Sequence, residues 1–367
     1  MKKVLIFGMT ENPGGVETFL MNYYRRLNSK ELHFDFLGAT DTQIAYEKEI
    51  KKYSKVFHIP VRKKHPLKYW QAINAFFKKY ASDYDCIWVN LNTLINMDYL
   101  KLAKKYGIKK IIIHSHSSKN MDNKLKKYIH LYNKNRVAKY ATDFWACSNL
   151  AAQWFYPEEI LPEVKIIKNA IDVSEFKFDE GKRNTIRRQY NLTNDFVIGN
   201  VGRLHFEKNQ SFAIDVFNEF LKINSNSKLI LVGQGNDKSL LLRKAEKLGI
   251  KDKVIFTGVQ YDMQGWYSAF DCFIFPSFFE GLGLAAVEAQ ANGLLTISAS
   301  KNIPQELAIN PNFEFLDLNK GPAFWASLIN EKKLKSRISF DKVIKNFNST
   351  GYNINTAVDD LKNKLMR

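Results

Sequence analysis

Two glutamates eight positions apart, Glu280 and Glu288, mark the segment of this sequence that is best suited to chemistry. The apolar residues 273–276 before them are typical of a buried strand that ends at a proline. Gly281 and Gly283 then lead into a run of strong helix formers. A strand, a glycine loop and a helix in this order present free backbone N–H groups and the positive end of a helix dipole, which suits a phosphate.

The two glutamates are better suited to hydroxyl groups than to a phosphate, because a carboxylate repels an anion and accepts hydrogen bonds from hydroxyls. A helix projected from Glu280 places Glu288 about 80° round its axis. An anion with hydroxyls on both sides describes a nucleotide sugar. Either glutamate could instead only complement the helix dipole or be solvated. Glu288, however, lies among Ala, Val and Gln, where a carboxylate needs a partner.

Two cations follow a second expected strand, residues 196–201. Gly202 and Arg203 come directly after this strand, and Lys208 lies where the next helix should begin. Parallel strands would put these cations on the same edge of a sheet as the Glu280 loop. Arg grips a phosphate through two hydrogen bonds and Lys adds a point charge, so the pair could stabilise a departing diphosphate. Taken singly, either cation could simply face solvent.

Three further motifs lie at expected strand ends. Gly14 and Gly15 could bring backbone close to a ligand, or could form a plain turn between a strand and a helix. They lack the three-glycine spacing of a dinucleotide fingerprint. A histidine at the end of the expected strand 111–114 could bond a sugar hydroxyl or move a proton. His114, which closes the strand, could equally be a core histidine, and His116 in the loop beyond it is the better candidate. The two glycines in residues 233–235 indicate a tight turn beside a nucleotide crevice.

Apolar segments of strand length alternate with helical segments along the whole chain, which predicts an α/β fold with parallel sheets. The expected strands are residues 4–7, 32–37, 56–59, 86–89, 111–114, 142–146, 165–168, 196–201, 228–232, 254–256, 272–275 and 294–297. We expect two doubly wound, Rossmann-like domains that face each other across a cleft. They would cover residues 1–170 and 171–350, with a helix over residues 351–367 that could cross back to the first domain.

Length and composition agree with two domains. At 367 residues the chain exceeds what one hydrophobic core comfortably holds. No apolar run is long enough to span a membrane, and the apolar run at the start is too short for a signal peptide. The three cysteines are too widely spaced for a disulfide framework or a metal site, which indicates a reducing compartment. Of the net charge of +18, residues 1–170 contribute +14, from 29 Lys and Arg against 15 Asp and Glu, which implies an anionic partner.

The order of the motifs along the chain carries a resemblance to a known family. The motifs are Gly14-Gly15-Val16-Glu17, Gly202-Arg203 with Lys208, Gly233-Gln234-Gly235 and the pair Glu280/Glu288. They resemble those of retaining glycosyltransferases of the GT-B fold, family 4 type, and most of all those of bacterial capsular or exopolysaccharide synthesis. The resemblance covers essentially the whole chain, and its specific part is the glutamate pair together with Arg203 and Lys208.

The resemblance implies that the C-terminal domain holds a nucleotide-sugar donor. Arg203 and Lys208 would bind the diphosphate, Glu288 the ribose and Glu280 the sugar, while His116 would lie near the anomeric carbon. Catalysis would thus fall to Glu280, Lys208, Arg203 and His116. The donor-binding residues implied are Gly14, Gly15, Gly202, Arg203, Lys208, Gly281, Leu282, Gly283, Leu284 and Glu288. The family often has Pro at the position of Gly283, and a glycine there is expected to loosen the loop.

The resemblance also implies the partners. The donor is expected to be a UDP-sugar, with GDP-mannose second, and no cofactor or metal is expected because the cations and the helix end neutralise the leaving group. Retention would follow from attack on the same face, with the departing phosphate taking the acceptor proton. The acceptor would be a saccharide, commonly lipid-linked, held by the basic N-terminal domain. We therefore expect a cytoplasmic protein, peripheral at the anionic inner face of the plasma membrane.

Three other readings remain open at this point. The charge could indicate a nucleic-acid-binding protein, although no recognition helix, zinc motif or stacking motif accompanies it. Two Rossmann-like domains also occur in non-hydrolysing sugar-nucleotide epimerases and in phosphorylases. A catalytically inactive scaffold is the third reading, and the presence of all four charged site residues argues against it.

Overall fold

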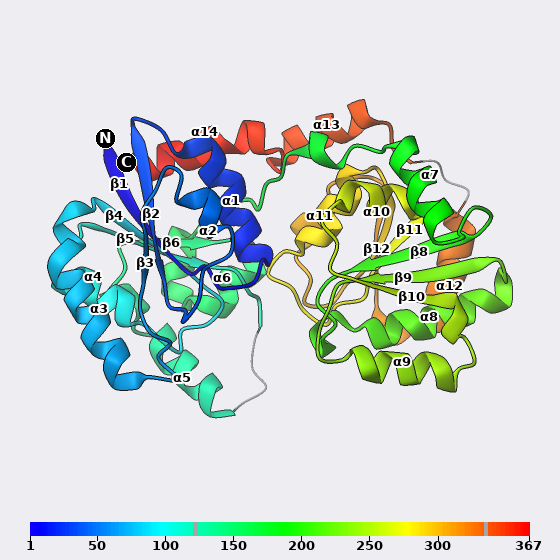
Figure 1. Ribbon diagram of the computed structural model, residues 1–367, viewed down its shortest axis with the longest axis horizontal. Coiled ribbons are helices and arrows are strands. Elements are labelled where there is room, and N and C mark those ends of the chain that lie inside the picture. Colours follow the sequence, from blue (N-terminus) through cyan, green and yellow to red (C-terminus); the bar gives the residue numbers. More distant parts are fainter. Residues whose placement is uncertain (120–123, 334–336) are drawn as a thin grey trace. The chain divides into compact units, whose positions relative to one another are not determined.

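The computed structural model describes residues 1–119, 124–333 and 337–367, which form two units, each built on a parallel sheet (Figure 1). Unit 1 contains residues Met1–Ala170 and Ile354–Arg367, and unit 2 contains Ile171–Asn353.

In the described part of unit 1, seven strands lie in the order β3-β2-β1-β4-β5-β6-β7. They are β1 (Lys2–Phe7), β2 (Leu32–Gly38), β3 (Val56–His58), β4 (Cys86–Leu91), β5 (Lys110–Ser115), β6 (Asp143–Ala146) and β7 (Lys165–Ile166). The central strand β1 pairs with β2 and β4, and Ile6 lies opposite Phe36 and Trp88 in the register. Both faces of β1 are covered, which explains why its sequence is almost continuously apolar.

Helices pack on this sheet and close the core of unit 1. They are α1 (Gly15–Leu27), α2 (Glu47–Ile50), α3 (Pro66–Tyr80), α4 (Asp98–Lys105), α5 (Lys124–Lys134), α6 (Asn149–Phe155) and, from the end of the chain, α14 (Ile354–Met366). Leu361 and Leu365 of α14 are buried in the same apolar cluster as Phe19 and Leu20 of α1. At the end of α14, Lys110 Nζ donates to the carbonyl oxygen of Lys364 at 2.6 Å.

In the described part of unit 2, six parallel strands lie in the order β10-β9-β8-β11-β12-β13. They are β8 (Phe196–Val201), β9 (Ser227–Val232), β10 (Val254–Gly258), β11 (Cys272–Phe275), β12 (Leu295–Ala299) and β13 (Phe313–Leu316). Figure 1 shows α8 and α9 below these strands and α10 and α11 above them. The helices of this unit are α7 (Glu180–Gln189), α8 (Gln210–Ile223), α9 (Lys238–Lys247), α10 (Met263–Ala269), α11 (Leu284–Ala291), α12 (Gly321–Lys332) and α13 (Phe340–Thr350).

The predicted fold class is confirmed, because both sheets are parallel and helices separate their strands. Each expected strand is present with its ends shifted by a few residues at most. The edge strand β13 was not predicted, since it is short and carries a glutamate in its middle. The cleft between the domains stays a prediction. No helix within the described ranges is long and apolar enough to cross a bilayer.

Candidate active site

The carboxyl edge of the unit 2 sheet brings two loops together, as the strand order requires. The neighbouring strands β8 and β11 end at Val201 and Phe275, so the segments that follow them emerge side by side. Asn209 Nδ2 donates to the carbonyl oxygen of Pro276 at 3.1 Å, and the Phe278 N–H donates to the carbonyl oxygen of Glu207 at 2.9 Å. These bonds fix the loop that carries the predicted cations against the loop that carries Glu280.

Lys208 and Glu280, predicted separately, form an ion pair with 2.6 Å between Nζ and Oε1. Lys208 ends a short 3₁₀ turn, Phe206–Lys208, directly before α8. Its ammonium also lies 5.8 Å from the centre of the Phe275 ring. Glu280 is buried. A partly desolvated ammonium held by a carboxylate has a defined position and acts more strongly on a nearby anion than a solvated lysine would.

Free backbone donors lie next to this pair. Among the described residues, the N–H groups of Leu282, Gly283, Leu284 and Ala285 donate to no acceptor. They form the start of α11, where the positive end of the helix dipole adds to their effect. Unpaired N–H groups beside an ammonium make a site for an anion such as a phosphate.

Gly283 has a left-handed backbone conformation, and the expectation that it loosens this loop stays a prediction. It precedes α11 with a φ of 102°, a left-handed conformation that proline cannot adopt. A Cβ atom at Gly283 would lie 2.8 Å from two ring carbons of Phe275. In this protein the glycine therefore permits one particular tight conformation of the phosphate loop.

Glu288 lies in α11 and has a partner of its own. The hydroxyl of Tyr267 donates to Glu288 Oε2 at 2.7 Å. Burial raises the pKa of Glu288 to about 7, against the opposing effect of this hydrogen bond. The helical projection from Glu280 was wrong, because α11 begins only at Leu284 and Glu280 lies in the loop before it.

Arg203 and the two glycine motifs of unit 2 have different local roles. Arg203 is exposed, and in the described chain its guanidinium has no hydrogen-bond or ion-pair partner. Gly202 follows β8, and a Cβ atom there would lie 3.5 Å from Lys208 Cγ, which is ordinary van der Waals contact. A Cβ at Gly233 would lie 2.1 Å from the carbonyl oxygen of Gly202, and one at Gly235 would lie 2.1 Å from that of Leu204. The second motif therefore lets two loops of the site pack closely.

In unit 1 the glycine motif starts α1. Gly14 is the residue before the helix, and both it and Gly15 are exposed. Glu17 is buried, and its Oε1 accepts hydrogen bonds from the backbone N–H of Thr10 at 2.9 Å and from its hydroxyl at 2.7 Å. The glutamate of this motif thus ties the loop after β1 to the first turn of α1.

His116 lies in the loop after β5 and is neutral. Its Nε2 donates to Asn90 Oδ1 at 2.9 Å, because the Asn90 amide nitrogen is used by the carbonyl oxygens of Phe7 and Trp88. Burial lowers the pKa of His116 to about 3. Nδ1 therefore carries a lone pair, and it has no partner among the described residues. With this pKa the ring stays neutral, and its Nδ1 can accept a hydrogen bond.

His114 is a core residue, which is one of the two readings that its position at the end of the strand allowed. It is fully buried, and its ring lies 4.0 Å from that of His116 between centroids. Trp88 stacks beside it at 6.0 Å. Neither ring nitrogen of His114 has a hydrogen-bond partner in the described chain, and burial keeps its pKa well below the usual value.

Sequence reasoning missed two polar side chains near the site. Tyr267 comes from α10 and supports Glu288, and no residue pattern linked the two. The hydroxyl of Ser277, directly after β11 and its proline, is buried and has no partner among the described residues. The rule that ligand groups follow strand ends would have found Ser277, since it applies to this residue as it does to Arg203.

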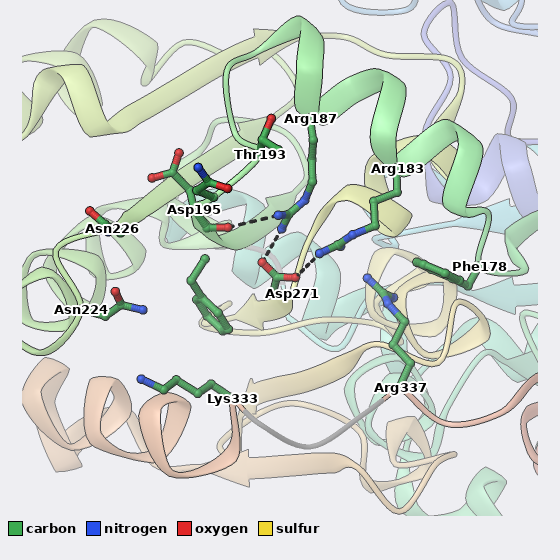
Figure 2. Close-up of a pocket in the computed structure, with 12 residues that line it drawn as sticks. Phe178, Arg183, Arg187, Thr193, Asp195, Asn224, Asn226, Asp271, Lys333 and Arg337 are labelled. Carbon is green, nitrogen blue, oxygen red and sulfur yellow. Dashed lines mark hydrogen bonds and ion pairs between the residues drawn. The ribbon is translucent and has the colours of Figure 1, made fainter.

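The opposite, amino edge of the unit 2 sheet holds a cavity of about 660 Å³ that is rich in cations (Figure 2). Arg183 and Arg187 converge there on Asp271, which lies before β11, with 2.6 Å between Arg183 Nη2 and Asp271 Oδ1. Arg337 and Lys333 line the other side. None of these four cations was expected to form a site.

The arginines of this cavity already donate to protein oxygens. Arg183 Nη1 donates to the carbonyl oxygens of Ser268 at 2.8 Å and Phe270 at 3.1 Å. Arg337 donates to both as well, and burial lowers its pKa to about 9. These carbonyl groups belong to the end of α10, which has no intrahelical partners for them. The cluster therefore caps a helix and holds the strands together, and its donors are not free for a ligand.

Comparisons with known proteins concern the family and the fold of the chain. Residues 182–315 match the family model described as glycosyl transferases group 1. The chain is 24% identical to EpsF of Bacillus subtilis over 376 residues, which are 99% of this chain and 96% of EpsF. It is 27% identical to the capsular polysaccharide biosynthesis glycosyltransferase CapH of Staphylococcus aureus, over 99% of this chain and 98% of CapH.

Two further similarities are to a curated Escherichia coli transferase and to a solved structure. An Escherichia coli UDP-Gal:α-D-GlcNAc-diphosphoundecaprenol α-1,3-galactosyltransferase is 28% identical over 54% of this chain and 53% of its own. The crystal structure of Anabaena HepE in complex with UDP and glucose superposes with a TM-score of 0.80 at 19% identity, covering both chains completely. The chain thus has the GT-B fold, and residues 182–315 of unit 2 are similar to the glycosyl transferases group 1 family.

Proposed function

We propose that this protein is a retaining, metal-independent glycosyltransferase, family 4 type, that transfers a hexose from a nucleotide sugar to a saccharide acceptor in surface polysaccharide synthesis. The observation that carries the proposal is the carboxyl-edge site of unit 2. There the Lys208–Glu280 pair lies beside the four unpaired N–H groups that begin α11. Such a site is complementary to a diphosphate that gains charge as it departs.

Each site residue is assigned one role. The α11 N–H groups and Lys208 bind the donor diphosphate, and the exposed guanidinium of Arg203 adds two further donors. Glu280 keeps Lys208 in place and accepts hydrogen bonds from the donor sugar. Glu288 accepts hydrogen bonds from the ribose hydroxyls, with Tyr267 fixing its orientation. In unit 1, the unprotonated Nδ1 of His116 accepts a hydrogen bond from a sugar hydroxyl.

The cations explain why no metal is required in the proposed mechanism. An ammonium, a guanidinium and a helix end supply the positive charge that a divalent ion would otherwise give to the leaving diphosphate. The acceptor hydroxyl would attack from the face that the diphosphate leaves, and the departing phosphate oxygen would take the hydroxyl proton. The anomeric configuration of the donor is then retained.

The donor is proposed to be a UDP-sugar, with GDP-mannose as the second choice. The UDP complexes of HepE and the UDP-Gal specificity in the name of the E. coli relative support UDP. The diphosphoundecaprenol acceptor in that name supports a lipid-linked saccharide here. The charge of +14 on residues 1–170 supports attachment to an anionic inner-membrane surface, where each basic residue near the surface adds about 1 kcal/mol.

Thermal unfolding with a panel of nucleotides and nucleotide sugars in EDTA tests the proposal. A ligand at 100 times its Kd adds about 2.7 kcal/mol to the free energy of unfolding, which is readily detected. We expect one nucleotide class to raise Tm, and the matching sugar donor to yield an α-linked product when its own anomeric bond is α. A product of inverted configuration, or an epimerised nucleotide sugar formed without any acceptor, would contradict it.

A further inference from the structure

Asn90 is a buried side chain near the end of β4 that joins two loops of unit 1. Its amide nitrogen donates to the carbonyl oxygen of Phe7, at the end of β1, and to that of Trp88 in its own strand, both at 3.2 Å. Its Oδ1 accepts from Nε2 of His116, in the loop after β5, at 2.9 Å. Because β4 lies between β1 and β5 in the sheet, this one side chain connects the ends of three neighbouring strands.

These contacts allow only one orientation of the Asn90 amide. In the opposite orientation, Oδ1 would face the carbonyl oxygens of Phe7 and Trp88 with no hydrogen between them. With Oδ1 directed at the imidazole, Nε2 of His116 must carry the hydrogen, because two acceptors at 2.9 Å would repel each other. In the neutral ring the lone pair then lies on Nδ1.

Packing holds both partners in this geometry. A Cβ atom at Gly8, directly after β1, would lie 2.2 Å from the carbonyl oxygen of Asn90, so the loop passes against β4 with no room for a side chain. The backbone N–H of His116 donates to the Leu91 carbonyl oxygen at 3.1 Å. Its ring lies 5.1 Å from that of Phe19 in α1, between centroids. The imidazole is therefore held from its backbone, from one nitrogen and from one face.

Nδ1 of His116 is an acceptor that no described residue uses. The atom is shielded from solvent. Buried polar atoms without a partner are uncommon in folded proteins, and each one requires an explanation. A lone pair that is held in place repels a phosphate or a carboxylate and favours a group that donates, such as a hydroxyl. The chemistry of this atom therefore fits a sugar hydroxyl and not an anionic group.

We propose that Asn90 is a positioning residue that fixes His116 as the Nε2–H tautomer, and that this tautomer makes the site select a sugar hydroxyl over an anionic group. The inference rests on the proposed function, in which a sugar ring lies at His116. It adds a residue that lies within a strand and is assigned no contact with the ligand. The effect of Asn90 on sugar transfer should therefore pass through His116.

NMR of the free protein with ¹⁵N-labelled histidine tests the tautomer without any substrate. We expect a slowly exchanging Nε2–H signal from His116, assigned by its loss in His116→Gln, and an Nδ1 signal of the unprotonated type. Asn90→Leu should shift or remove the N–H signal, because this variant removes its acceptor.

Asn200→Leu is the matched control for this measurement. Asn200 and Asn90 are each 2% exposed and are each the last residue but one of a strand. Asn200 Nδ2 also donates to a carbonyl oxygen of a neighbouring strand, that of Ile274, at 2.9 Å. Asn200→Leu should leave the His116 signal unchanged, since Asn200 belongs to unit 2.

Two NMR results would overturn the proposal. One is an Nδ1–H tautomer of His116 in wild type, which needs no variant and decides the question even if Asn90→Leu does not fold. The other is an Nε2–H signal that responds to Asn90→Leu no more than it does to Asn200→Leu.

A double-mutant cycle tests whether Asn90 acts through His116. Loss of one neutral hydrogen bond to the sugar in His116→Ala should lower kcat/KM about tenfold. Asn90→Leu should lose a similar factor, and the double variant should stay within about twofold of His116→Ala, because all three lack the same interaction. Losses that multiply in the double variant would mean that Asn90 acts independently of His116, and the positioning role would be wrong.

Donor analogues test the selection of a hydroxyl. Replacing single ring hydroxyls of the transferred sugar by fluorine, with UDP-glucose the first donor to be tried, removes one hydrogen-bond donor at a time. We expect one position at which fluorine lowers kcat/KM about tenfold in wild type and has no such effect in His116→Ala. Equal losses in both proteins at every position would contradict the assignment of Nδ1.

The outcome can be told apart from that of the proposed function. The NMR comparison uses the free protein, whereas the proposed function is tested by nucleotide binding and sugar transfer. If no nucleotide sugar is bound or transferred, the proposed function fails, and the selection of a sugar hydroxyl fails with it. The NMR spectra would still decide whether Asn90 sets the tautomer of His116.

Discussion

At the carboxyl edge of the unit 2 sheet, one lysine is paired with one glutamate, and four neighbouring N–H groups donate to nothing in the described chain. At the amino edge of the same sheet, Arg183 and Arg187 converge on Asp271, and Arg183 and Arg337 donate to the carbonyl groups that end α10. The second region holds more positive charge and the defined cavity (Figure 2). The first region holds the backbone N–H groups that have no acceptor in the described chain.

The difference shows that the number of cations alone does not identify an anion site. A guanidinium whose N–H groups already meet buried carbonyl oxygens would have to leave those oxygens unsatisfied to bind a ligand. At a helix start beside a lysine, the N–H groups have no protein acceptor, so a phosphate that replaces water there breaks no hydrogen bond within the protein. We therefore propose that the nucleotide-sugar donor binds at Lys208 and α11, and that the arginine cluster contributes to stability.

The largest expected effect is that of Lys208→Ala on turnover. Removing the ammonium should lower kcat about 10³-fold, because its charge acts on the leaving group in the transition state. Lys244→Ala is the matched control, since Lys244 is also paired with a carboxylate and its side chain is 26% exposed against 24% for Lys208. Steady-state transfer assays on both variants give the comparison. A loss of less than tenfold in Lys208→Ala would remove this residue from the site.

The converse change is Asp271→Asn in the arginine cluster. It leaves buried guanidinium groups without their counter-charge and should lower the free energy of unfolding by about 3 kcal/mol. Urea denaturation measures this loss, and titration of the folded variant should give the wild-type Kd for the nucleotide. Wild-type stability combined with weakened nucleotide binding would reverse the roles of the two regions.

Glu288 should make nucleotide binding depend on pH. Its pKa is raised to about 7, so the carboxylate that accepts ribose hydroxyls is lost as the pH falls through that value. We expect affinity to rise about tenfold between pH 6 and pH 8. Titrations across this range should show the dependence in wild type and not in Glu288→Gln, which corrects for ionisation of the ligand.

Tyr267→Phe sharpens the same test. The tyrosine hydrogen bond lowers the pKa of Glu288, so its removal should move the midpoint of the pH profile upward. The effect on affinity should therefore be largest near neutral pH and small at pH 8. A uniform loss at all pH values would mean that Tyr267 contacts the ligand itself.

The smallest effect is expected for Lys333→Ala, at the rim of the arginine cavity. We expect a change in the free energy of unfolding below about 0.5 kcal/mol and no change in nucleotide Kd. Thermal unfolding with and without nucleotide measures both quantities in one series. A weakened nucleotide response would show that the cavity takes part in donor binding after all.

The sequence was sufficient to predict that the loops after β8 and β11 emerge at the same edge of the unit 2 sheet. It thereby predicted that Lys208 and Glu280 lie near each other. That success has a physical basis: buried parallel strands are continuously apolar, and loops after neighbouring strands share an edge. The arginine cluster could not be predicted, because Arg183 and Arg337 lie far apart in sequence and come together only through α10. The Tyr267–Glu288 hydrogen bond could not be predicted for the same reason, since its two residues come from different helices.

One local error has an equally specific cause. The helical projection from Glu280 assumed a helix that begins four residues too early, whereas α11 begins at Leu284. The φ of 102° at Gly283 is a property of the folded loop and could not be predicted from the sequence.

The most direct test of the account is a crystal structure of this protein with UDP, grown in EDTA. We predict that the diphosphate lies at the start of α11, within hydrogen-bonding distance of the Leu282–Leu284 backbone N–H groups and of Lys208 Nζ, with the ribose at Glu288. A diphosphate bound instead among Arg183, Arg187 and Arg337 would contradict the central claim.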